Sequence, residues 1–386
     1  MKGFFNLSHL SAGFTTVLVG YTSSVVIVIQ AATASGANPA QIESWLLTLG
    51  VVMGLTSILY SWFYKTPIVT AWSTPAAAML AASAGQYSLP VVIGAFMFSG
   101  ALFTLTGMLA PLTRALSKIP VPLGTAMLGA ILLPFCAKAF TPLTDTPALF
   151  ALLFTSYLLA KHFVPRYTML VLLLVSLGSA LALGSFQHAD LALRIATPIW
   201  VMPEFDWLAI LNLALPLYLI TMLSQNLPGI AMLKSYQYDA PIKPILVGTG
   251  LATLMSAPFG GFSVNLAAIS AAICMNEDVD QDKAQRYRAV LWVGGCYLLA
   301  GIFAALVVNL FLALPKPISA MLAGLALLGT LMMCLQSAFK IDEHREPALL
   351  TFVITLSGAT LFGMSATLIG LVIGLAYLRL TTRPRP

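Results

Sequence analysis

Charged side chains are scarce in this sequence of 386 residues, of which only 8% are Asp, Glu, Lys or Arg. A soluble domain averages about 25% charged residues, so this chain lacks the polar groups that would cover a water-facing surface. Hydrophobic residues make up 59% of the chain, and its mean hydropathy is +0.93. These values exclude an ordinary soluble protein and indicate a protein that faces the lipid bilayer.

Ionisable side chains are missing from the middles of the apolar stretches. The thirteen acidic residues and four histidines all fall in connections or near the ends of stretches. Intramembrane proteases and membrane metalloenzymes need paired acids, a Ser–His set or metal ligands at membrane depth, so we do not expect an enzyme. The cysteines have no metal-like spacing, and neither a metal nor another cofactor is expected; they are Cys136, Cys274, Cys296 and Cys334.

Apolar stretches recur from Ser11 almost to the end of the sequence, and each is long enough to cross the bilayer as a helix. They lack the alternating pattern of barrel strands, and therefore predict an all-α polytopic membrane protein. We expect about fourteen transmembrane segments, at 11–34, 41–63, 68–84, 90–110, 123–137, 146–160, 167–184, 207–233, 244–256, 262–275, 289–311, 318–336, 348–362 and 364–380.

Basic residues are distributed unevenly among the connections. With a cytoplasmic N-terminus, sixteen of the nineteen Lys and Arg residues fall in inside connections, and only Lys138, Arg194 and Lys316 fall outside. This bias obeys the positive-inside rule and predicts a multi-pass protein of the inner (cytoplasmic) membrane with both termini in the cytoplasm. The net charge of +6 therefore reflects topology, and no nucleic-acid partner is expected.

The longest polar connection, at 185–206, divides the expected spans into seven and seven. An odd number of spans per half places the halves in opposite orientations, which is the arrangement of inverted-repeat transporters. We therefore expect a first inverted repeat at 1–185 and a second at 186–386.

The third span of each half breaks the helical pattern. The first contains TAWSTP at 70–75, and the second contains GGFSVN at 260–265. Pro75 suits the first turn of a helix that a preceding hydroxyl residue caps, whereas the paired glycines permit non-helical backbone. We expect spans 3 and 10 to be extended first and helical afterwards, with helices that begin near Ser73 and Asn265; two merely kinked helices are the alternative.

Interrupted spans in matching positions indicate a binding site. Two helix N-termini that point at one cavity present free N–H groups and positive dipole ends, which favour an anion such as a carboxylate. Neighbouring hydroxyls and amides can add hydrogen bonds, and aromatic side chains can pack against a ring. The candidate binding residues are Ser73, Thr74, Ser263 and Asn265, with Trp72 and Phe262 as flanking aromatics and Ser23 and Ser24 from the first span.

A polar motif, SQNLPG at 224–229, lies in the eighth span. Adjacent Gln225 and Asn226 are costly in lipid unless they are paired, and Pro228-Gly229 is expected to loosen the helix beside them. We include both amides in the candidate site; hydrogen bonding between helices is the alternative role.

At these motifs, TAWSTP, SQNLPG and GGFSVNLAA, the chain resembles the benzoate/proton symporter (BenE) family. The resemblance implies the fold of nucleobase permeases and anion exchangers. Its core domain comprises spans 1–4 and 8–11, at about 1–112 and 207–312. Its gate domain comprises spans 5–7 and 12–14, at about 113–206 and 313–386. The resemblance also implies homodimers and an elevator-like movement of core against gate.

The implied function is proton-coupled import of benzoate or a similar aromatic carboxylate. Nucleobase permeases of this fold use acidic residues in spans 8 and 10, whereas the matching positions here are Gln225 and Val264-Asn265. We therefore expect the proton to travel on the carboxyl group of the substrate, or through a peripheral acid such as Glu43 or Asp145. A passive facilitator or channel for a neutral small molecule, and a permease for a nucleobase or another anion, are the alternatives.

Overall fold

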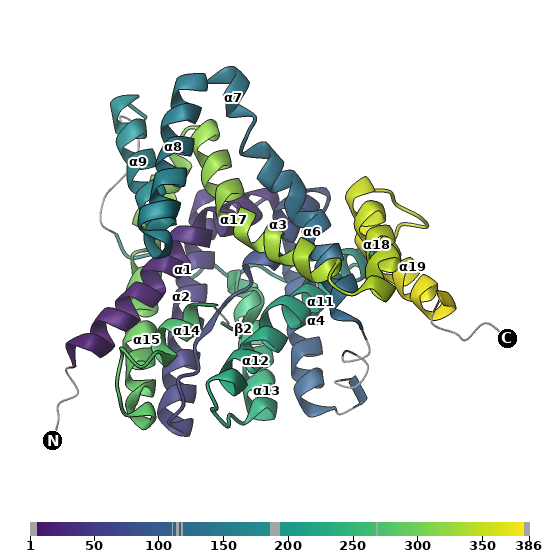
Figure 1. Cartoon of the computed structure of the whole chain (residues 1–386), viewed down its shortest axis with the longest axis horizontal. Helices are drawn as coiled ribbons and strands as arrows, with labels where there is room; N and C mark the ends of the chain where they lie inside the picture. Colours follow the sequence, from purple (N-terminus) through teal and green to yellow (C-terminus); the bar gives the residue numbers. More distant parts are fainter. Residues whose placement is uncertain are drawn as a thin grey trace.

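The computed structural model describes residues 6–109, 111–112, 116, 119–185, 194–267 and 269–381. These residues form a bundle of helices in which α1 and α19 lie on opposite sides (Figure 1). The elements of the first half are α1 (Leu7–Ala34), α2 (Pro39–Tyr64), β1 (Thr70–Trp72), α3 (Thr74–Ser83), η1 (Ala84–Gln86), α4 (Leu89–Met108), α6 (Val121–Lys138), α7 (Pro142–Asp145), α8 (Pro147–Phe163), η2 (Pro165–Tyr167) and α9 (Thr168–Ala182).

The second half begins with a helix of several joined parts. Its elements are α10 (Trp207–Ala209), η3 (Ile210–Ala214), α11 (Leu215–Thr221), η4 (Met222–Asn226), α12 (Leu227–Ser235), α13 (Ile242–Ser256), η5 (Ala257–Phe259), β2 (Val264–Leu266), α14 (Ile269–Met275), η6 (Lys283–Gln285), α15 (Tyr287–Ile302), α16 (Ala304–Leu312), α17 (Lys316–Ala338), η7 (Asp342–His344), α18 (Arg345–Ser357) and α19 (Ala366–Thr381).

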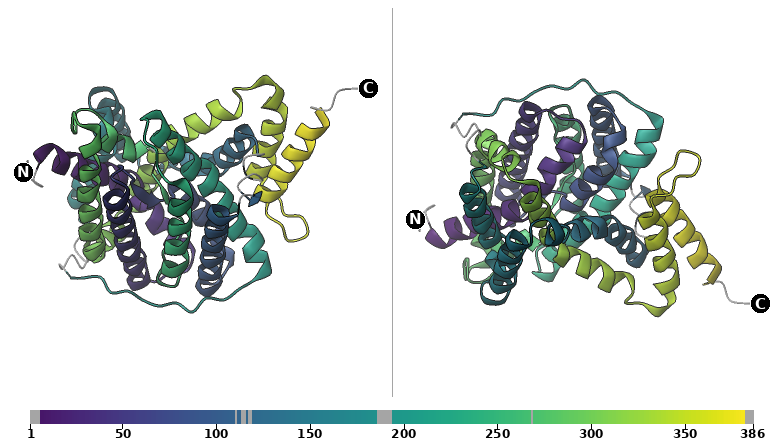
Figure 2. Two further views of the ribbon diagram at one scale, coloured as in Figure 1. Left: turned by 90° about the horizontal axis from the view of Figure 1, so that it is seen from below. Right: turned by 90° about the horizontal axis from the view of Figure 1, so that it is seen from above.

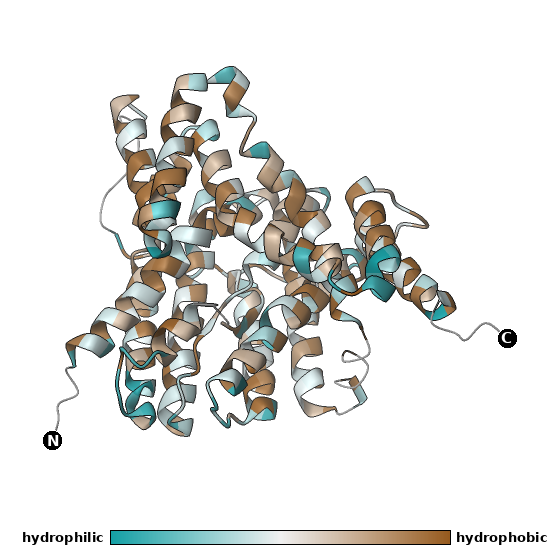
Figure 3. Cartoon of the chain, viewed as in Figure 1, coloured by the Kyte–Doolittle hydropathy of each residue, from teal (hydrophilic) through white to brown (hydrophobic). Residues whose placement is uncertain are grey.

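Each apolar segment of the sequence coincides with a helix, a run of joined helices, or a strand followed by a helix. Within the described chain, eight helices are long and apolar enough to cross a membrane, or nine if the bent pair α15–α16 is one span. The helices α8 and α19 are apolar but shorter. Hydrophobic residues run along most helices, and hydrophilic ones gather at helix ends and connections (Figure 3). The protein is therefore a helical, multi-pass membrane protein, and the count of fourteen spans in a 7+7 repeat stays a prediction.

Two details refine the expected elements. The extended parts of the two interrupted spans form a two-stranded antiparallel sheet, β1 with β2. The expected span 289–311 is bent, since α15 and α16 meet at an angle of 62°. The carbonyl oxygen of Ile302 accepts a hydrogen bond from the N–H of Ala196 at 3.1 Å, and the next residue, Phe303, leaves the helical region with φ −92° and ψ 21°.

The eighth span runs from Trp207 to Ser235 and contains two π-helical turns, η3 and η4. Each turn lies just before a proline, Pro216 or Pro228. Proline lacks an N–H group, and its ring clashes with the carbonyl group four residues earlier in a regular helix. A π-helical turn removes this conflict locally. The loosening expected at Pro228-Gly229 therefore falls one turn earlier, on the turn that carries the amides of the SQNLPG motif.

The helices pack into two groups. We define the core group as α1–α4 and α10–α16, in which α2 packs on α15 and α4 packs on α13. We define the gate group as α6–α9 and α17–α19, in which α6 contacts α17, α18 and α19. The two groups meet where α1 and α3 touch α6, α9 and α17. The gate group lies along the upper and right sides of the molecule in Figure 1.

A long extended segment, 194–206, runs along one edge of the molecule (Figure 2). We call it the strap. Its backbone N–H groups donate to core-group atoms, with Val201 bonded to Pro258 O at 2.8 Å and Glu204 bonded to Pro90 O at 2.9 Å. Arg194 forms an ion pair of 2.6 Å with the buried Glu43 of α2. These bonds attach the strap to the core group, and the division into core and gate domains with their boundaries stays a prediction.

Candidate functional site

The two interrupted segments cross near the centre of the molecule, where β2 is visible in Figure 1. Strands β1 and β2 are antiparallel, and Ala71 lies opposite Asn265 in their register. The N–H of Ala267 extends the ladder by donating to Val69 O at 2.9 Å. Spans 3 and 10 are thus extended first and helical afterwards, as the sequence predicted, and their extended parts pair with each other.

Hydroxyl groups of neighbouring helices satisfy the outer sides of the strands. The N–H of Thr70 donates to Ser57 Oγ of α2 at 3.0 Å, and the N–H of Val264 donates to Thr253 Oγ1 of α13 at 3.0 Å. Non-helical backbone at membrane depth needs partners from the protein, because lipid provides none. These hydroxyl groups are not among the candidate residues predicted from the sequence. The signal available in the sequence was the spacing of Ser and Thr residues along otherwise apolar helices.

The amides of the SQNLPG motif lie against β2. Asn226 is buried, and its Oδ1 accepts a hydrogen bond from the N–H of Leu266 at 3.0 Å. Gly229 brings its helix close, because a Cβ at that position would lie 2.6 Å from the Cβ of Leu266. Gln225 is half-buried and has no hydrogen bond to any described residue. Asn226 therefore holds the strand in place, while the side chain of Gln225 remains available for a ligand.

Helix α3 begins at the crossing point as expected. Ser73 is fully buried, and its Oγ caps the helix by accepting a hydrogen bond from the N–H of Ala76 at 3.2 Å. Thr74, the first helical residue, is half-buried and is followed by Pro75. The second helix does not begin near Asn265, which lies in β2; α14 begins at Ile269. The extended conformation continues further there because the strand pairing includes Leu266 and Ala267.

Two polar side chains at the start of β2 carry atoms without a partner. Ser263 Oγ and Asn265 Oδ1 are fully buried and accept or donate no hydrogen bond within the described chain. Asn265 Nδ2 donates to Ser263 O at 2.7 Å, which fixes the orientation of the amide and leaves Oδ1 as a free acceptor. Ser263 also has φ +44°, a strained value for a residue with a side chain. Buried unpaired groups and strained backbone of this kind cluster at binding sites.

The first span contributes a polar and aromatic wall. Trp72 donates from Nε1 to Ser24 Oγ at 2.9 Å, and the rings of Trp72 and Tyr21 lie 5.1 Å apart. The hydroxyl oxygen of Tyr21 is buried without a partner among the described residues. Ser23 bonds to Gly20 O of its own helix at 3.0 Å. Ser24 therefore positions Trp72 beside the paired strands. Tyr21 joins the candidate site through its ring contact with Trp72, whereas the hydroxyl group of Ser23 is bonded within its own helix.

Phe262 lies in an aromatic cluster of the core group. It is fully buried, and its ring centroid lies 5.9 Å from that of Trp45 and 5.7 Å from that of Phe96. Packing of this kind supports the turn that precedes β2, so the structure gives Phe262 a role in holding Ser263. A direct contact of Phe262 with a ligand stays a prediction.

Comparison with known protein sequences identifies close relatives. Residues 3–380 match the family model described as "Benzoate membrane transport protein" (BenE). The inner membrane protein YdcO of Escherichia coli is 40% identical over 365 residues, which cover 95% of this chain and 93% of that protein. The benzoate membrane transport protein of Acinetobacter baylyi is 35% identical over 385 residues, which cover 100% of this chain and 98% of that protein.

Solved structures of distant sequence share the fold. The transmembrane domain of the cyanobacterial bicarbonate transporter BicA superposes with a TM-score of 0.61 at 16% identity, covering 98% of this chain and 97% of that chain. The structure of SLC26A9 gives a TM-score of 0.65 at 14% identity. This chain is covered to 97% in that superposition but spans only 66% of the SLC26A9 chain. Murine Slc26a9 in the inward-facing state gives a TM-score of 0.63 at 13% identity.

Replacing Asn226 tests its role as the anchor of β2. The Asn226→Ala variant leaves the buried N–H of Leu266 without an acceptor, so we expect the free energy of unfolding to fall by about 1–3 kcal/mol. Thermal unfolding in detergent measures this loss. Ser224→Ala is the matched control, because Ser224 Oγ bonds only to Ile220 O of its own helix, at 2.7 Å. Equal unfolding temperatures for the two variants would contradict the assignment.

Proposed function

The chain belongs to the BenE family of benzoate membrane transport proteins, and on this premise we propose that it imports benzoate or a similar aromatic carboxylate by proton-coupled secondary transport. The protein is a membrane transporter and not an enzyme. The benzoate membrane transport protein of A. baylyi aligns with the whole chain, which supports a substrate of the same chemical class.

The observation that carries the proposal is the pair of buried, unpartnered atoms Ser263 Oγ and Asn265 Oδ1 beside the strand crossing. A hydroxyl group can donate a hydrogen bond, and an amide oxygen can accept one. A carboxylic acid group needs one donor for its carbonyl oxygen and one acceptor for its O–H. The two atoms provide this complement.

This chemistry suits a substrate that carries its own proton. The amide oxygen of Asn265 faces a neutral acid more favourably than a carboxylate, because two acceptors repel. The peripheral acids are less suited to carry the proton: Glu43 is paired with Arg194 at 2.6 Å, and Asp145 is exposed at the end of α7. We therefore propose that benzoate crosses the membrane as benzoic acid, held by Ser263 and Asn265.

The aromatic part of the substrate has a matching surface. Trp72 and Tyr21 form a pair of rings next to the strands, and Ser24 fixes the orientation of Trp72. Offset or edge-on ring contacts contribute about 0.5–1.5 kcal/mol beyond burial. We place the ring of the substrate against this pair, with Gln225 on the opposite wall and Ser73 and Thr74 at the helix end.

Alternating access fits the division into core and gate groups. The strands, α3 and η4 all belong to the core group, so a rigid movement of that group would carry the candidate site across the membrane. The strap is bonded to the core group and would move with it. We propose this elevator-like movement, in a homodimer, with both termini in the cytoplasm as the positive-inside rule indicates.

The Asn265→Ala variant tests the binding role of the free amide oxygen. We expect its affinity for benzoate to fall at least tenfold, about 1.4 kcal/mol, in titration calorimetry of the detergent-solubilised protein. Its stability without ligand should fall by no more than the loss of one hydrogen bond, about 1 kcal/mol. Asn309→Ala is the matched control, because Asn309 Nδ2 is also buried without a partner in the described chain but lies on α16. Unchanged affinity in Asn265→Ala would remove this residue from the site.

Proton coupling has a separate test in proteoliposomes. We expect an acidic outside to accelerate uptake of labelled benzoate above the rate in protein-free liposomes, because the acid form of the substrate increases as pH falls. Asp145→Asn should keep this acceleration in full. An uptake rate that is the same with and without a pH gradient would rule out coupling. Absence of counterflow with unlabelled benzoate on the opposite side would favour a passive channel instead.

A further inference from the structure

The largest cavity described for the molecule lies away from the strands. A cavity of about 810 Å³ opens at the N-terminal end of α1. Its walls come from both groups of helices, with α1 and α14 from the core group and the η2 turn between α8 and α9 from the gate group. Its lining includes Leu7 and Val19 of α1, Ile273 of α14, Arg166 of η2, and Asp278.

The cavity extends deep along α1. Twelve residues separate Leu7 from Val19, a distance of about 18 Å along a helix that rises 1.5 Å per residue. Val19 lies one helical turn before Ser23, so the two side chains share a face of α1, and the adjacent Ser24 accepts a hydrogen bond from Trp72 at the candidate site. The cavity therefore extends along α1 toward the level of the strand crossing.

The other end of α1 is closed against the gate group. There, Gln30 Nε2 donates to Ser319 O of α17 at 3.5 Å. The cavity at that end measures only about 210 Å³ and is lined by residues that include Gln30, Phe135 and Lys138. The larger of these two cavities thus opens at the N-terminal end of α1, which is the cytoplasmic end in the proposed orientation.

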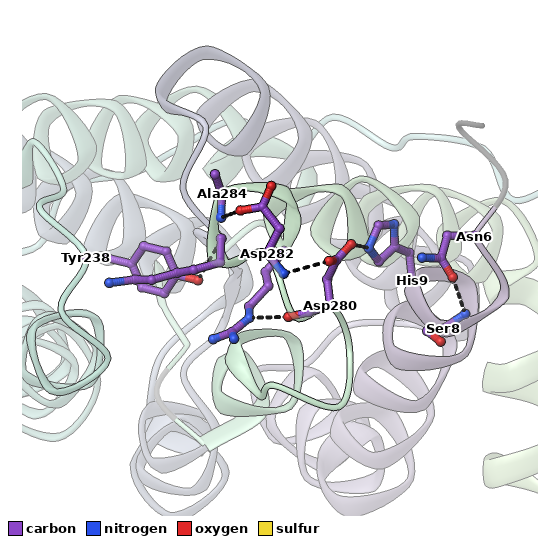
Figure 4. Close-up of polar contacts among 9 residues, drawn as sticks. Asn6, Ser8, His9, Tyr238, Asp280, Asp282 and Ala284 are labelled. Atoms are coloured by element: carbon purple, nitrogen blue, oxygen red, sulfur yellow. Dashed lines mark hydrogen bonds and ion pairs between the residues drawn. The ribbon is translucent and has the colours of Figure 1, made fainter. Parts of the chain in front are cut away.

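Two charged side chains line the large cavity within the described chain, Arg166 from the gate group and Asp278 from the core group. Two acids of the same loop, Asp280 and Asp282, are engaged elsewhere (Figure 4). Asp280 pairs with the buried His9 at 2.9 Å, and Asp282 accepts the N–H of Ala284 at 2.9 Å. Arg286 donates from Nε to Asp280 O at 2.8 Å, so these contacts hold the loop that forms this wall.

We propose that Arg166 binds the carboxylate anion of the substrate at the cytoplasmic mouth of the transport path. This inference rests on the proposed function. A guanidinium group favours the ionised carboxylate over the neutral acid, and a single cation at the mouth of a low-dielectric cavity raises the local concentration of an anion. Asp278, on the facing wall, opposes the anion. The pair therefore sets how readily the carboxylate enters or leaves on this side.

Side-specific kinetics in proteoliposomes test the proposal. In Arg166→Gln, the apparent KM for benzoate presented to the cytoplasmic face should rise roughly tenfold, and its dependence on salt concentration should weaken. The KM at the outer face should stay unchanged. Arg166→Lys should restore most of the loss, and Asp278→Asn should lower the cytoplasmic KM. Lys161→Gln is the control, because Lys161 is an exposed cation at the nearby end of α8 that does not line the cavity.

The outcomes separate this inference from the proposed function. If the wild-type protein neither binds nor transports benzoate, the proposed function itself fails. If the wild-type protein transports benzoate and Arg166→Gln has the wild-type KM at both faces, only the role of Arg166 is overturned. An equal rise of KM at both faces, or an equal effect in Lys161→Gln, would also overturn it.

Discussion

The pairing of β1 with β2 is the constraint on which the site depends. Two unwound segments in the interior of a membrane protein must find hydrogen-bond partners within the protein, and here they find each other. Ser57, Thr253 and Asn226 satisfy the remaining N–H groups of the strands. With these bonds made, Ser263 Oγ and Asn265 Oδ1 stand out as buried polar atoms that lack partners within the described chain. A ligand can form hydrogen bonds with these two atoms.

Helix α1 connects this site to the end of the molecule that is cytoplasmic in the proposed orientation. Ser24 and Tyr21 lie beside Trp72, the first turns of α1 line the large cavity, and His9 anchors the loop that follows α14. At the opposite end it contacts α17 of the gate group. A movement of the core group past the gate group would therefore change both ends of α1 together. The strap is hydrogen-bonded to α2, η5 and α4, so it would connect these elements of the core group during such a movement.

The sequence predicted much of the fold because composition and apolar length decide where a membrane helix lies. Pro75 and Ser73 also predicted the start of α3 correctly. The sequence could not place the second helix start, since the length of β2 depends on its pairing partner. It could not locate the π-helical turn at Gln225, which avoids the clash that the ring of Pro228 would cause in a regular helix. It could not show that Phe262, which stays a predicted ligand contact, also packs against Trp45 and Phe96, because such packing is a property of the tertiary structure.

In the proposed mechanism, the strand crossing binds an aromatic carboxylic acid. Ligand-induced thermal stabilisation of the detergent-solubilised protein tests it most directly, because a ligand that binds the folded state raises the unfolding temperature by mass action. Benzoate, substituted benzoates, uracil, xanthine and sulfate would be compared at two pH values. We expect stabilisation by the aromatic carboxylates alone, and a larger effect at the lower pH. Stabilisation by uracil or sulfate, with none by benzoate, would contradict it.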